Sequence, residues 1–416
     1  MNLIKLAARN IRRHRKRSTV TILTICLGFT ALGVIGGIVN NIYSRLKGQA
    51  IVVEKLGHIT FAKEGFFANG KIEPEKYLWT QDELDRIQAV VRADERVAVA
   101  TPRLSLLGIA SNGNASTVFL TEAIVPADDR ELIETPVDGR RRTRGATTLA
   151  AGGGQQTDVA IGSELAANLG LEEGDFLTLL TTTKEGMANA VDVDIRQVFN
   201  TGNPATNDKY VLTNFELAQD LYDTRGAQRL VVTLHEDGDV DGVRDELVAQ
   251  LTAAGLSVEA RSWDEQSLYY AKIRTMFGAI FRVLTIIITV VIVLTLLNTM
   301  QMAVAERTQE IGTMRAIGMQ KAQIIALFCL EGIIMGVVAC ALSVPILLGI
   351  SQLLKALDVT FIPPVASVAV PIALMLQPKT LVVVFVLFCL AALVSSFSAS
   401  LRIARQNIVD SLTKAI

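Results

Sequence analysis

The 416-residue sequence predicts a membrane protein with four transmembrane helices and a large extracytoplasmic α+β domain inserted between helices 1 and 2. Half of the residues are hydrophobic, and the mean hydropathy of +0.39 is unusual for a soluble chain of this length. Four apolar segments are long enough to cross a bilayer of about 30 Å. Charge is divided unequally, because residues 45–272 carry 23 Lys and Arg against 36 Asp and Glu, and the remainder carries 17 against 5.

The apolar segments and the stretches between them divide the chain into consecutive parts. We expect four spans, at 18–43, 273–302, 322–354 and 380–401, and a proline interrupts the third. A basic N-terminal helix at 1–17 precedes the first span, and the large domain with its stalk at 44–272 follows it. A charged helix at 303–321, a short loop at 355–379 and a tail at 402–416 complete the chain. The first apolar run is longer than the roughly 7–15 residues of a signal peptide, and no Ala-x-Ala site follows it. We therefore expect a retained anchor.

Basic residues predict the orientation of the spans, because Lys and Arg are enriched at the cytoplasmic edges of membrane segments. They flank the spans in three regions, which should share the cytoplasmic side together with both termini. These residues are Lys5, Arg9, Arg12, Arg13, Arg15, Lys16 and Arg17 before the first span, Arg307, Arg315 and Lys321 between the second and third, and Arg402, Arg405 and Lys414 after the fourth. The 44–272 domain and the 355–379 loop then lie outside. Each of the four spans moves the chain to the other side of the membrane, so this arrangement agrees with cytoplasmic positions for both termini.

The large domain mixes strand and helix patterns, which is typical of a compact α+β fold. VAVATPRLSLLGIA and STVFLTEAIV flank SNGNA, and this pattern predicts a β-hairpin with an Asn-Gly turn. Strands alternate with helices over residues 158–180, 209–223 and 229–263. Residues 138–157 are rich in Gly, Thr and Arg, so we expect a loop whose Arg140, Arg141, Arg142 and Arg144 are a solvated charge run rather than an anion site. A helix is expected to begin near residue 264 and to enter the second span without a break.

The sequence contains no motif that predicts catalysis. There is no G-x-x-x-x-G-K-[ST] phosphate loop and no H-E-x-x-H, and the three histidines are scattered. Cys26, Cys329, Cys340 and Cys389 all lie in apolar segments, where thiols act most simply as small packing residues. We expect no catalytic residue, no bound cofactor and no metal site in this chain.

A charged, helix-prone segment, ERTQEIGTMRAIGMQKAQII, separates the second and third spans. On a helix, Arg307 and Glu310 are three residues apart and could pair. An apolar stripe would comprise Ile311, Met314, Ile317 and Met319. We expect an amphipathic helix at the cytoplasmic face that ends near Gly318. Such a helix is either a polar loop of helical shape or a docking element for a cytoplasmic partner.

Several stretches resemble one family. The run E-R-x-x-E-I-G-x-x-R-A-I-G, from Glu306 to Gly318, resembles the signature of FtsX/MacB/LolC-type ABC transporter permeases. LAARNIRRHRKRSTVTILTICLG resembles the N-terminal helix and first span of these permeases, and RIARQNIVDSL is similar to their cytoplasmic tail. The order of one span, a large outer domain and three spans is also similar, with a MacB-like periplasmic core and an FtsX-like membrane domain.

The resemblance implies that the charged segment is a coupling helix, which would sit in a groove on a separate ATP-binding subunit. The residues that carry this match are Glu306, Arg307, Glu310, Ile311, Gly312, Met314, Arg315 and Gly318. The working unit would contain a cytoplasmic ABC ATPase dimer, which binds ATP and Mg, and two permeases, either two copies or a paralogous pair. The chain would lie in the lipid bilayer of the bacterial inner membrane as a non-enzymatic subunit. Closure of the ATPase dimer would displace the spans and, through them, the periplasmic domains. We expect no nucleic-acid partner.

Polar and small residues inside the spans are further candidate sites. A carboxylate at Glu331 is costly in a membrane, so it should face the helix bundle or water, either for gating or for a structural hydrogen bond. Asn298 is expected to join helices by hydrogen bonding. Close helix contacts are predicted at the small-x-x-x-small pairs Gly33 with Gly37 and Gly332 with Gly336. We expect the first span to pack at the interface between two permeases.

The leading functional hypothesis is work on a lipoprotein or another amphipathic cargo outside the membrane, with a periplasmic carrier as a possible partner. The chain lacks the hook insertion of LolC, because few residues separate TLLTTTKEG from DVDIRQVF. This difference leaves open efflux of antibiotics or peptides with a periplasmic adaptor and an outer-membrane tube. An FtsX-like signalling lever that controls a cell-wall hydrolase is a further alternative. A membrane-anchored enzyme is disfavoured because no catalytic set is present.

Overall fold

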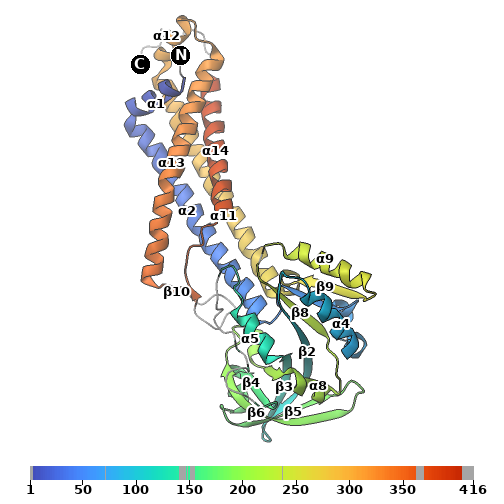
Figure 1. Ribbon diagram of the computed structural model, residues 1–416. Coiled ribbons are helices and arrows are strands. Elements are labelled where there is room, and N and C mark those ends of the chain that lie inside the picture. Colours follow the sequence, from blue (N-terminus) through green and yellow to red (C-terminus); the bar gives the residue numbers. More distant parts are fainter. Residues whose placement is uncertain are drawn as a thin grey trace. The chain divides into compact units, whose positions relative to one another are not determined.

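The computed structural model describes residues 3–70, 72–139, 147, 149, 155–236, 238–361 and 370–404. The chain forms two compact units (Figure 1). The helical unit comprises Met1–Ile42, Arg274–Thr360 and Pro371–Ile416, and the α+β unit comprises Tyr43–Ile273 and Phe361–Val370. Most of the expected Arg-rich loop at 138–157 and the end of the C-terminal tail lie outside the described residues.

Long helices dominate the helical unit. They are α1 (Leu3–Arg13), α2 (Arg15–Gly48), α11 (Leu268–Glu306), α12 (Thr308–Ala316), α13 (Lys321–Leu357) and α14 (Pro378–Ala404). Four of them, α2, α11, α13 and α14, are long and apolar enough to cross a membrane. The predicted fold class is confirmed, because the large α+β region lies between the first and second of these helices.

Three boundaries differ from the sequence expectation. The helix expected from residue 264 is broken at Ser267, which separates α10 (Trp263–Gln266) from α11. The charged segment is likewise divided, because α11 extends to Glu306 and only Thr308–Ala316 forms the separate helix α12. Pro345, in contrast, does not interrupt α13. Local backbone adjustments and neighbouring helices tolerate proline within membrane helices.

The core of the helical unit is formed by apolar side chains from four helices. Ile25 and Phe29 of α2, Ile292 of α11 and Phe388 of α14 are buried together with residues of α13. The rings of Phe29 and Phe388 meet edge to face, with centroids 6.1 Å apart. Helices α13 and α14 pack along each other, and α1 packs against α13 (Figure 1). The amphipathic α1 is therefore part of the folded unit.

The α+β unit is built on a nine-stranded sheet of order β3-β7-β4-β6-β5-β2-β8-β1-β9. An additional β2–β3 pairing closes six of these strands, β2 to β7, into a barrel. The bounds are β1 (Ile59–Lys63), β2 (Val97–Ser111), β3 (Ser116–Ile124), β4 (Asp158–Gly162), β5 (Phe176–Thr182), β6 (Ala188–Phe199), β7 (Tyr210–Asn214), β8 (Arg229–Leu234) and β9 (Val258–Ser262). The long strand β2 joins the two parts of the sheet, because its first half pairs with β8 and its second half with β3 and β5.

The expected β-hairpin and the strand–helix alternations are confirmed. The β2–β3 turn contains Gly113 at φ +86°, a left-handed conformation that favours glycine. Asn112 Oδ1 accepts hydrogen bonds from the backbone N–H groups of Asn114 and Ala115, which fixes the turn. Helix α6 (Ser163–Leu169) follows β4, α8 (Phe215–Tyr222) follows β7, and α9 (Val240–Ala253) follows β8.

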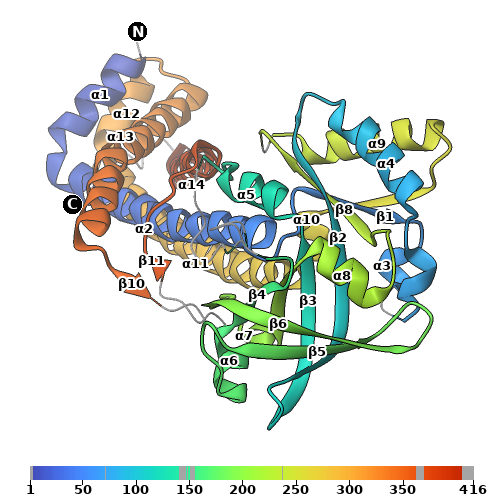
Figure 2. The ribbon, with the colours of Figure 1, turned by 60° about the horizontal axis from the view of Figure 1, so that its bottom comes forward.

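Helices cover part of the sheet. Helices α4 (Gln81–Arg92) and α9 lie side by side and bury Leu84, Ile87 and Leu247 against β2, β8, β1 and β9 (Figure 2). Helix α4 begins with a capping box between Thr80 and Glu83, which satisfies exposed N–H groups of its first turn. The remaining short elements are α3 (Phe66–Asn69), α5 (Pro126–Glu134), α7 (Pro204–Asn207), the π-helix Gln49–Val53, the 3-10 helix Pro74–Tyr77, β10 (Thr360–Phe361) and β11 (Val370–Pro371).

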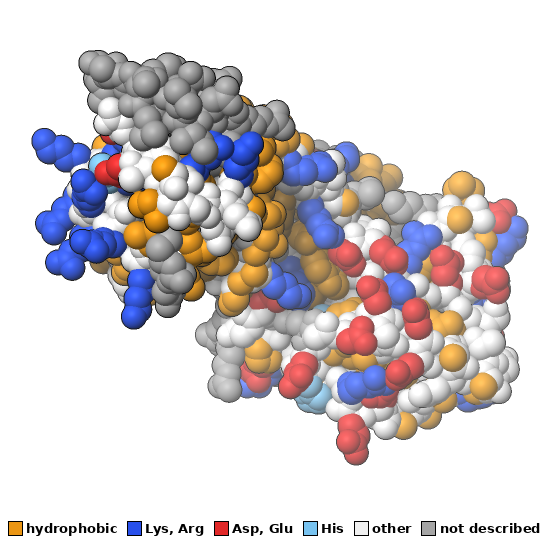
Figure 3. Space-filling view, turned by 90° about the horizontal axis from the view of Figure 1, so that it is seen from above, with side chains coloured by type: hydrophobic (Ala, Val, Ile, Leu, Met, Phe, Trp, Pro, Cys, Tyr) orange, Lys and Arg blue, Asp and Glu red, His pale blue; other side chains and the backbone are white. Residues whose placement is uncertain are grey.

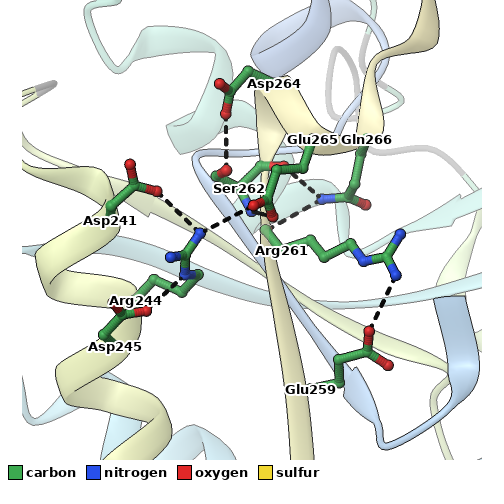
Figure 4. Close-up of polar contacts among 9 residues, drawn as sticks. All are labelled: Asp241, Arg244, Asp245, Glu259, Arg261, Ser262, Asp264, Glu265 and Gln266. Carbon is green, nitrogen blue, oxygen red and sulfur yellow. Dashed lines mark hydrogen bonds and ion pairs between the residues drawn. The ribbon is translucent and has the colours of Figure 1, made fainter.

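A polar network joins α9 to the segment that precedes α11 (Figure 4). Arg244 of α9 contacts Asp241 at 3.0 Å, Asp245 at 2.9 Å and Glu265 of α10 at 3.5 Å. Glu265 also takes part in the capping box that begins α10 at Ser262. The short helix α10, which ends one residue before α11, is therefore tied to the body of the α+β unit.

Candidate functional site

The charged segment between α11 and α13 lies beside the N-terminal helix. Helices α1 and α12 meet the ends of α11 and α13 at one end of the helical unit (Figure 1). Lys and Arg side chains gather over this end (Figure 3). All residues of this site belong to the helical unit, and we describe it from the backbone of α12 outwards.

The backbone makes α12 a separate helix. Arg307, at φ −99° and ψ 15°, breaks the helical course after Glu306, and its carbonyl then accepts the N–H of Ile311 at 2.9 Å. At the other end, the N–H groups of Gly318 and Met319 bond to the carbonyls of Arg315 and Met314, both at 3.0 Å. This is the Schellman pattern, and Gly318 adopts its left-handed position at φ +100°. The expected end of the helix near Gly318 is confirmed.

One face of α12 is buried. Ile311 is almost fully buried with Val304, Ile324 and Phe328, and Met314 and Met319 pack against them. Gly312 is also buried. The expected apolar stripe is wrong at one position, because Ile317 is 82% exposed at the C-terminal cap. Arg315 is half-buried in the last turn.

A buried ion pair anchors the break before α12. Arg307 Nη1 donates to both carboxylate oxygens of Glu331 on α13, at 3.0 and 3.3 Å, and the exposed fractions of the two residues are only 6% and 4%. Asn10 Nδ2 of α1 donates to Glu331 Oε1 at 2.7 Å. The suggested pairing of Arg307 with Glu310 is therefore wrong. Because the helix breaks at Arg307, the Arg307 side chain contacts Glu331 on α13 instead of Glu310. Of the two roles considered for Glu331, the structure supports the structural one, because its carboxylate accepts hydrogen bonds from Arg307 and Asn10.

The acidic residues of the segment pair with the N-terminal region. Arg13 Nη1 lies 3.2 Å from Glu310 Oε1, and Arg17 Nη2 contacts Glu306 Oε1. The pKa of His14, which lies between Arg13 and α2, is lowered from its ordinary value by partial burial and by the charge of Arg307. The cationic partners of the two acidic residues are arginines.

Asn10, Arg13 and Arg17 are the site residues that the sequence reasoning missed. They are spaced three and four residues apart, which places them on one face of a helix. The hydrogen bonds from His14 N–H to Asn10 O and from Ser18 N–H to His14 O keep this face continuous between α1 and α2. This spacing was a usable signal, but five other basic residues in the same region conceal it.

The small residues in the spans make contacts within the chain. A Cβ atom at Gly33 would lie 2.7 Å from Leu347 of α13, and one at Gly37 would lie 3.0 Å from Leu374. On α13, a Cβ atom at Gly332 would lie 2.0 Å from Ser396 Oγ of α14, and Gly336 also faces α14. The predicted close approach of helices is confirmed at Gly33, Gly332 and Gly336, whereas Gly37 faces the segment before α14. Packing of the first span against a second permease stays a prediction.

Within the described part of the chain, Asn298 does not join helices by a hydrogen bond. Its side chain is exposed on α11, and among the described residues no side-chain hydrogen bond reaches it. Within the described part of the chain there is also no group of three or more His, Cys, Asp or Glu side chains that could hold a metal ion. The described contacts around α12 are apolar packing, hydrogen bonds and ion pairs.

Comparison with known proteins adds evidence on the family. The family described as FtsX-like permease C-terminal matches residues 282–408, and the MacB-like periplasmic core domain matches residues 18–250. The chain is 24% identical over 329 residues to the lipoprotein-releasing system transmembrane protein LolC of Neisseria meningitidis, covering 76% of this chain and 72% of LolC. It is 29% identical over 135 residues to the ABC transporter permease YtrF of Bacillus subtilis, covering 29% of this chain and 28% of YtrF.

Among solved structures, the periplasmic region of MacB from Actinobacillus actinomycetemcomitans is similar to 50% of this chain, with 90% of that region covered, 11% identity and a TM-score of 0.35. The extracellular domain of the transporter YknZ from Gram-positive bacteria matches 49% of this chain and 99% of that domain, at 11% identity and a TM-score of 0.33. The periplasmic core match spans more than half of the sequence and the permease match covers α12, α13 and α14. The chain therefore belongs to the FtsX/MacB/LolC-type permeases of ABC transporters, which are multi-pass membrane proteins that pair with an ATPase.

Proposed function

We propose that this chain is the permease subunit of a type VII, MacB/LolCDE-like ABC transporter, driven by ATP hydrolysis in a separate ATPase dimer that binds ATP and Mg. The observation that carries the proposal is α12, a nine-residue helix whose inner face is buried and whose first residue follows a buried ion pair. Its other face exposes Gln309, Glu310, Thr313 and Ala316, followed by Ile317. A short, firmly held helix with one polar face and one exposed apolar side chain suits a groove on a cytoplasmic subunit.

Continuous helices suggest how work would reach the α+β unit. The boundaries between the two units fall inside helices, between Ile42 and Tyr43 in α2 and between Ile273 and Arg274 in α11. A displacement applied at α12 would pass along α11 to the α+β unit, which is mechanical transmission. Both termini and α12 would lie on the cytoplasmic side of the inner membrane, and the α+β unit on the periplasmic side.

A lipoprotein or another amphipathic molecule is the cargo we propose. The match to LolC, which is named as part of a lipoprotein-releasing system, extends over most of this chain and supports that class. One observation favours the second candidate, efflux of antibiotics or peptides with an adaptor. The turn between β5 and β6 comprises only residues 183–187, so no hook for a lipoprotein carrier extends from it.

The docking role of α12 is tested by co-purification of the full chain with a candidate ABC ATPase from the same genome. Ile317→Asp places a charge at the exposed cap of α12 and is expected to abolish co-purification. Ile72→Asp is the matched control, because Ile72 is 79% exposed in the α+β unit and should have no effect. Equal ATPase recovery with the wild type and with Ile317→Asp would contradict docking at this surface.

A further inference from the structure

The basic residues of the N-terminal region fall into two groups. Arg13 and Arg17 contact acidic residues of the charged segment. Lys5, Arg9, Arg12, Arg15 and Lys16 are exposed, and no ion pair joins them to any residue that the structure describes. Membrane orientation requires positive charge on one side but does not require it at particular positions. The contacts of Arg13 and Arg17 therefore need a separate explanation.

The contacting residues reach three different points around α12. Asn10 donates a hydrogen bond to Glu331 on α13, and Glu331 accepts hydrogen bonds from Arg307. Arg13 pairs with Glu310 in the first turn of α12, and Arg17 pairs with Glu306 at the end of α11. One helix face thus touches the helix before α12, α12 itself and the helix after it.

The covalent connections of α12 do not fix its direction by themselves. The preceding connection is the non-helical residue Arg307, and the following one is the glycine turn at Gly318. Glycine permits many backbone conformations, so a load on α12 could turn this helix instead of displacing α11 and α13. Contacts from α1 and from the first turns of α2 oppose that rotation.

We propose that Asn10, Arg13 and Arg17 form an N-terminal clamp that holds α12 in a fixed direction, so that a load from the ATPase is transmitted to α2 as well as to α11. This inference rests on the proposed function. The clamp residues are positioning residues, because they act through Glu331, Glu310 and Glu306. Arg13 and Glu310 are exposed, and Arg17 is half-buried beside the exposed Glu306. Ion pairs that reach solvent contribute little to folding, so variants that lack them should still fold.

The chain offers a matched control for each clamp arginine. Arg12 and Lys16 directly precede Arg13 and Arg17, carry the same charge and have no ion pair with the described residues. The Arg13→Gln/Arg17→Gln variant and the Arg12→Gln/Lys16→Gln variant therefore lose equal charge. Any difference between them reports on the contacts, whereas a general effect of positive charge would be the same in both.

The first arm of the experiment does not need the ATPase. Hydrogen–deuterium exchange is measured on the full chain in lipid nanodiscs. Amides of residues 308–316 should exchange faster in Arg13→Gln/Arg17→Gln than in the wild type, and at the wild-type rate in Arg12→Gln/Lys16→Gln. Equal exchange in the two variants would overturn the clamp, whatever the partner of α12 proves to be.

The second arm measures ATP hydrolysis by the ATPase in nanodiscs at saturating ratios of the two subunits. The clamp variant should lose about fivefold or more of the stimulated rate while ATPase binding is retained, since coupling free energies commonly correspond to factors of this size. The control variant should stay near the wild type, and the charge exchange Arg17→Glu/Glu306→Arg should recover activity that Arg17→Glu loses. Equal rates in the two double variants would overturn transmission through the clamp. Failure of the wild type to bind any ATPase would instead overturn the proposed function.

Discussion

The buried pair between Arg307 and Glu331 gives a prediction whose size follows from the structure. Glu331→Gln keeps the shape of the side chain and an acceptor for Asn10, but it removes the negative charge. Arg307 is 6% exposed, and its Nε has no hydrogen-bond partner among the described residues. The variant therefore leaves a guanidinium buried without a counter-charge.

Removing one partner of a buried ion pair destabilises a protein by about 3–5 kcal/mol. For a unit of this size, a loss of about 3 kcal/mol lowers the unfolding temperature by roughly 6–12 °C. The exposed pair of Arg13 with Glu310 should behave differently. Their side chains are 68% and 48% exposed, so Arg13→Gln should cost less than about 1 kcal/mol.

The chain contains separate probes for its two units. All four cysteines, Cys26, Cys329, Cys340 and Cys389, lie in the helical unit, and the two tryptophans, Trp79 and Trp263, lie in the α+β unit. Unfolding of the helical unit can be followed in detergent with a dye that reacts with thiols as they become accessible. Tryptophan fluorescence follows the α+β unit in the same sample.

We expect Glu331→Gln to lower the temperature of the thiol transition and to leave the tryptophan transition in place. The double variant Arg307→Met/Glu331→Gln should recover most of the loss, because it removes the unpaired charge. The reasoning is refuted if Glu331→Gln leaves the thiol transition unchanged, or if the double variant is less stable than either single one.

Three further predictions concern single positions. Gly332→Ala should destabilise the helical unit by about 1–3 kcal/mol, because the new Cβ atom would lie 2.0 Å from Ser396 Oγ. Gly336→Ala should destabilise it by less, because the new Cβ atom would lie 3.5 Å from its nearest neighbour. The thiol transition measures both. Burial raises the pKa of Glu54 above its ordinary 4.5, so its ionisation costs stability as pH rises through the raised pKa. Glu54→Gln should therefore unfold at a higher temperature than the wild type at pH 8 and at the same temperature near pH 4, measured by tryptophan fluorescence. Gly318→Ala strains the turn at φ +100° and loosens the end of α12, so it should weaken ATPase binding in a pull-down. Gly349→Ala is the control and should leave ATPase binding unchanged, because a Cβ atom there meets open space.

Local patterns in the sequence were sufficient for most of the fold. Apolar length predicts α2, α11, α13 and α14, and alternating strand and helix patterns predict β4, β5, β7, β8 and β9 with their helices but not β6. Glycine at the end of an apolar-periodic segment predicts the cap at Gly318. Each of these features is encoded by neighbouring residues, which is why the sequence alone suffices.

Features that depend on distant partners could not be predicted in this way. Asn10 and Glu331 are 321 residues apart, and no local pattern connects them. Closure of the barrel depends on β2 pairing with β3 as well as with β5, which hydrophobic periodicity does not specify. The break at Arg307 occurs in sequence that favours helix, so the contact of Arg307 with Glu331 on α13 overrides local preference there. The break at Ser267 has a local feature, because Ser267 Oγ accepts a hydrogen bond from the N–H of Tyr270 at the start of α11.

The measurement that tests the central claim most directly is ATP hydrolysis by the partner ATPase in nanodiscs, with and without this chain, comparing the wild type with Glu310→Lys. Glu310 is exposed on α12, and among the described residues its ion pair is the surface contact with Arg13. The variant therefore alters the docking face together with that contact and spares the buried pair at Arg307. We predict that the wild type binds the ATPase and changes its rate of hydrolysis, and that Glu310→Lys loses the complex or the change in rate. An unchanged complex with unchanged turnover would contradict the role of α12 as the element that couples this permease to its ATPase.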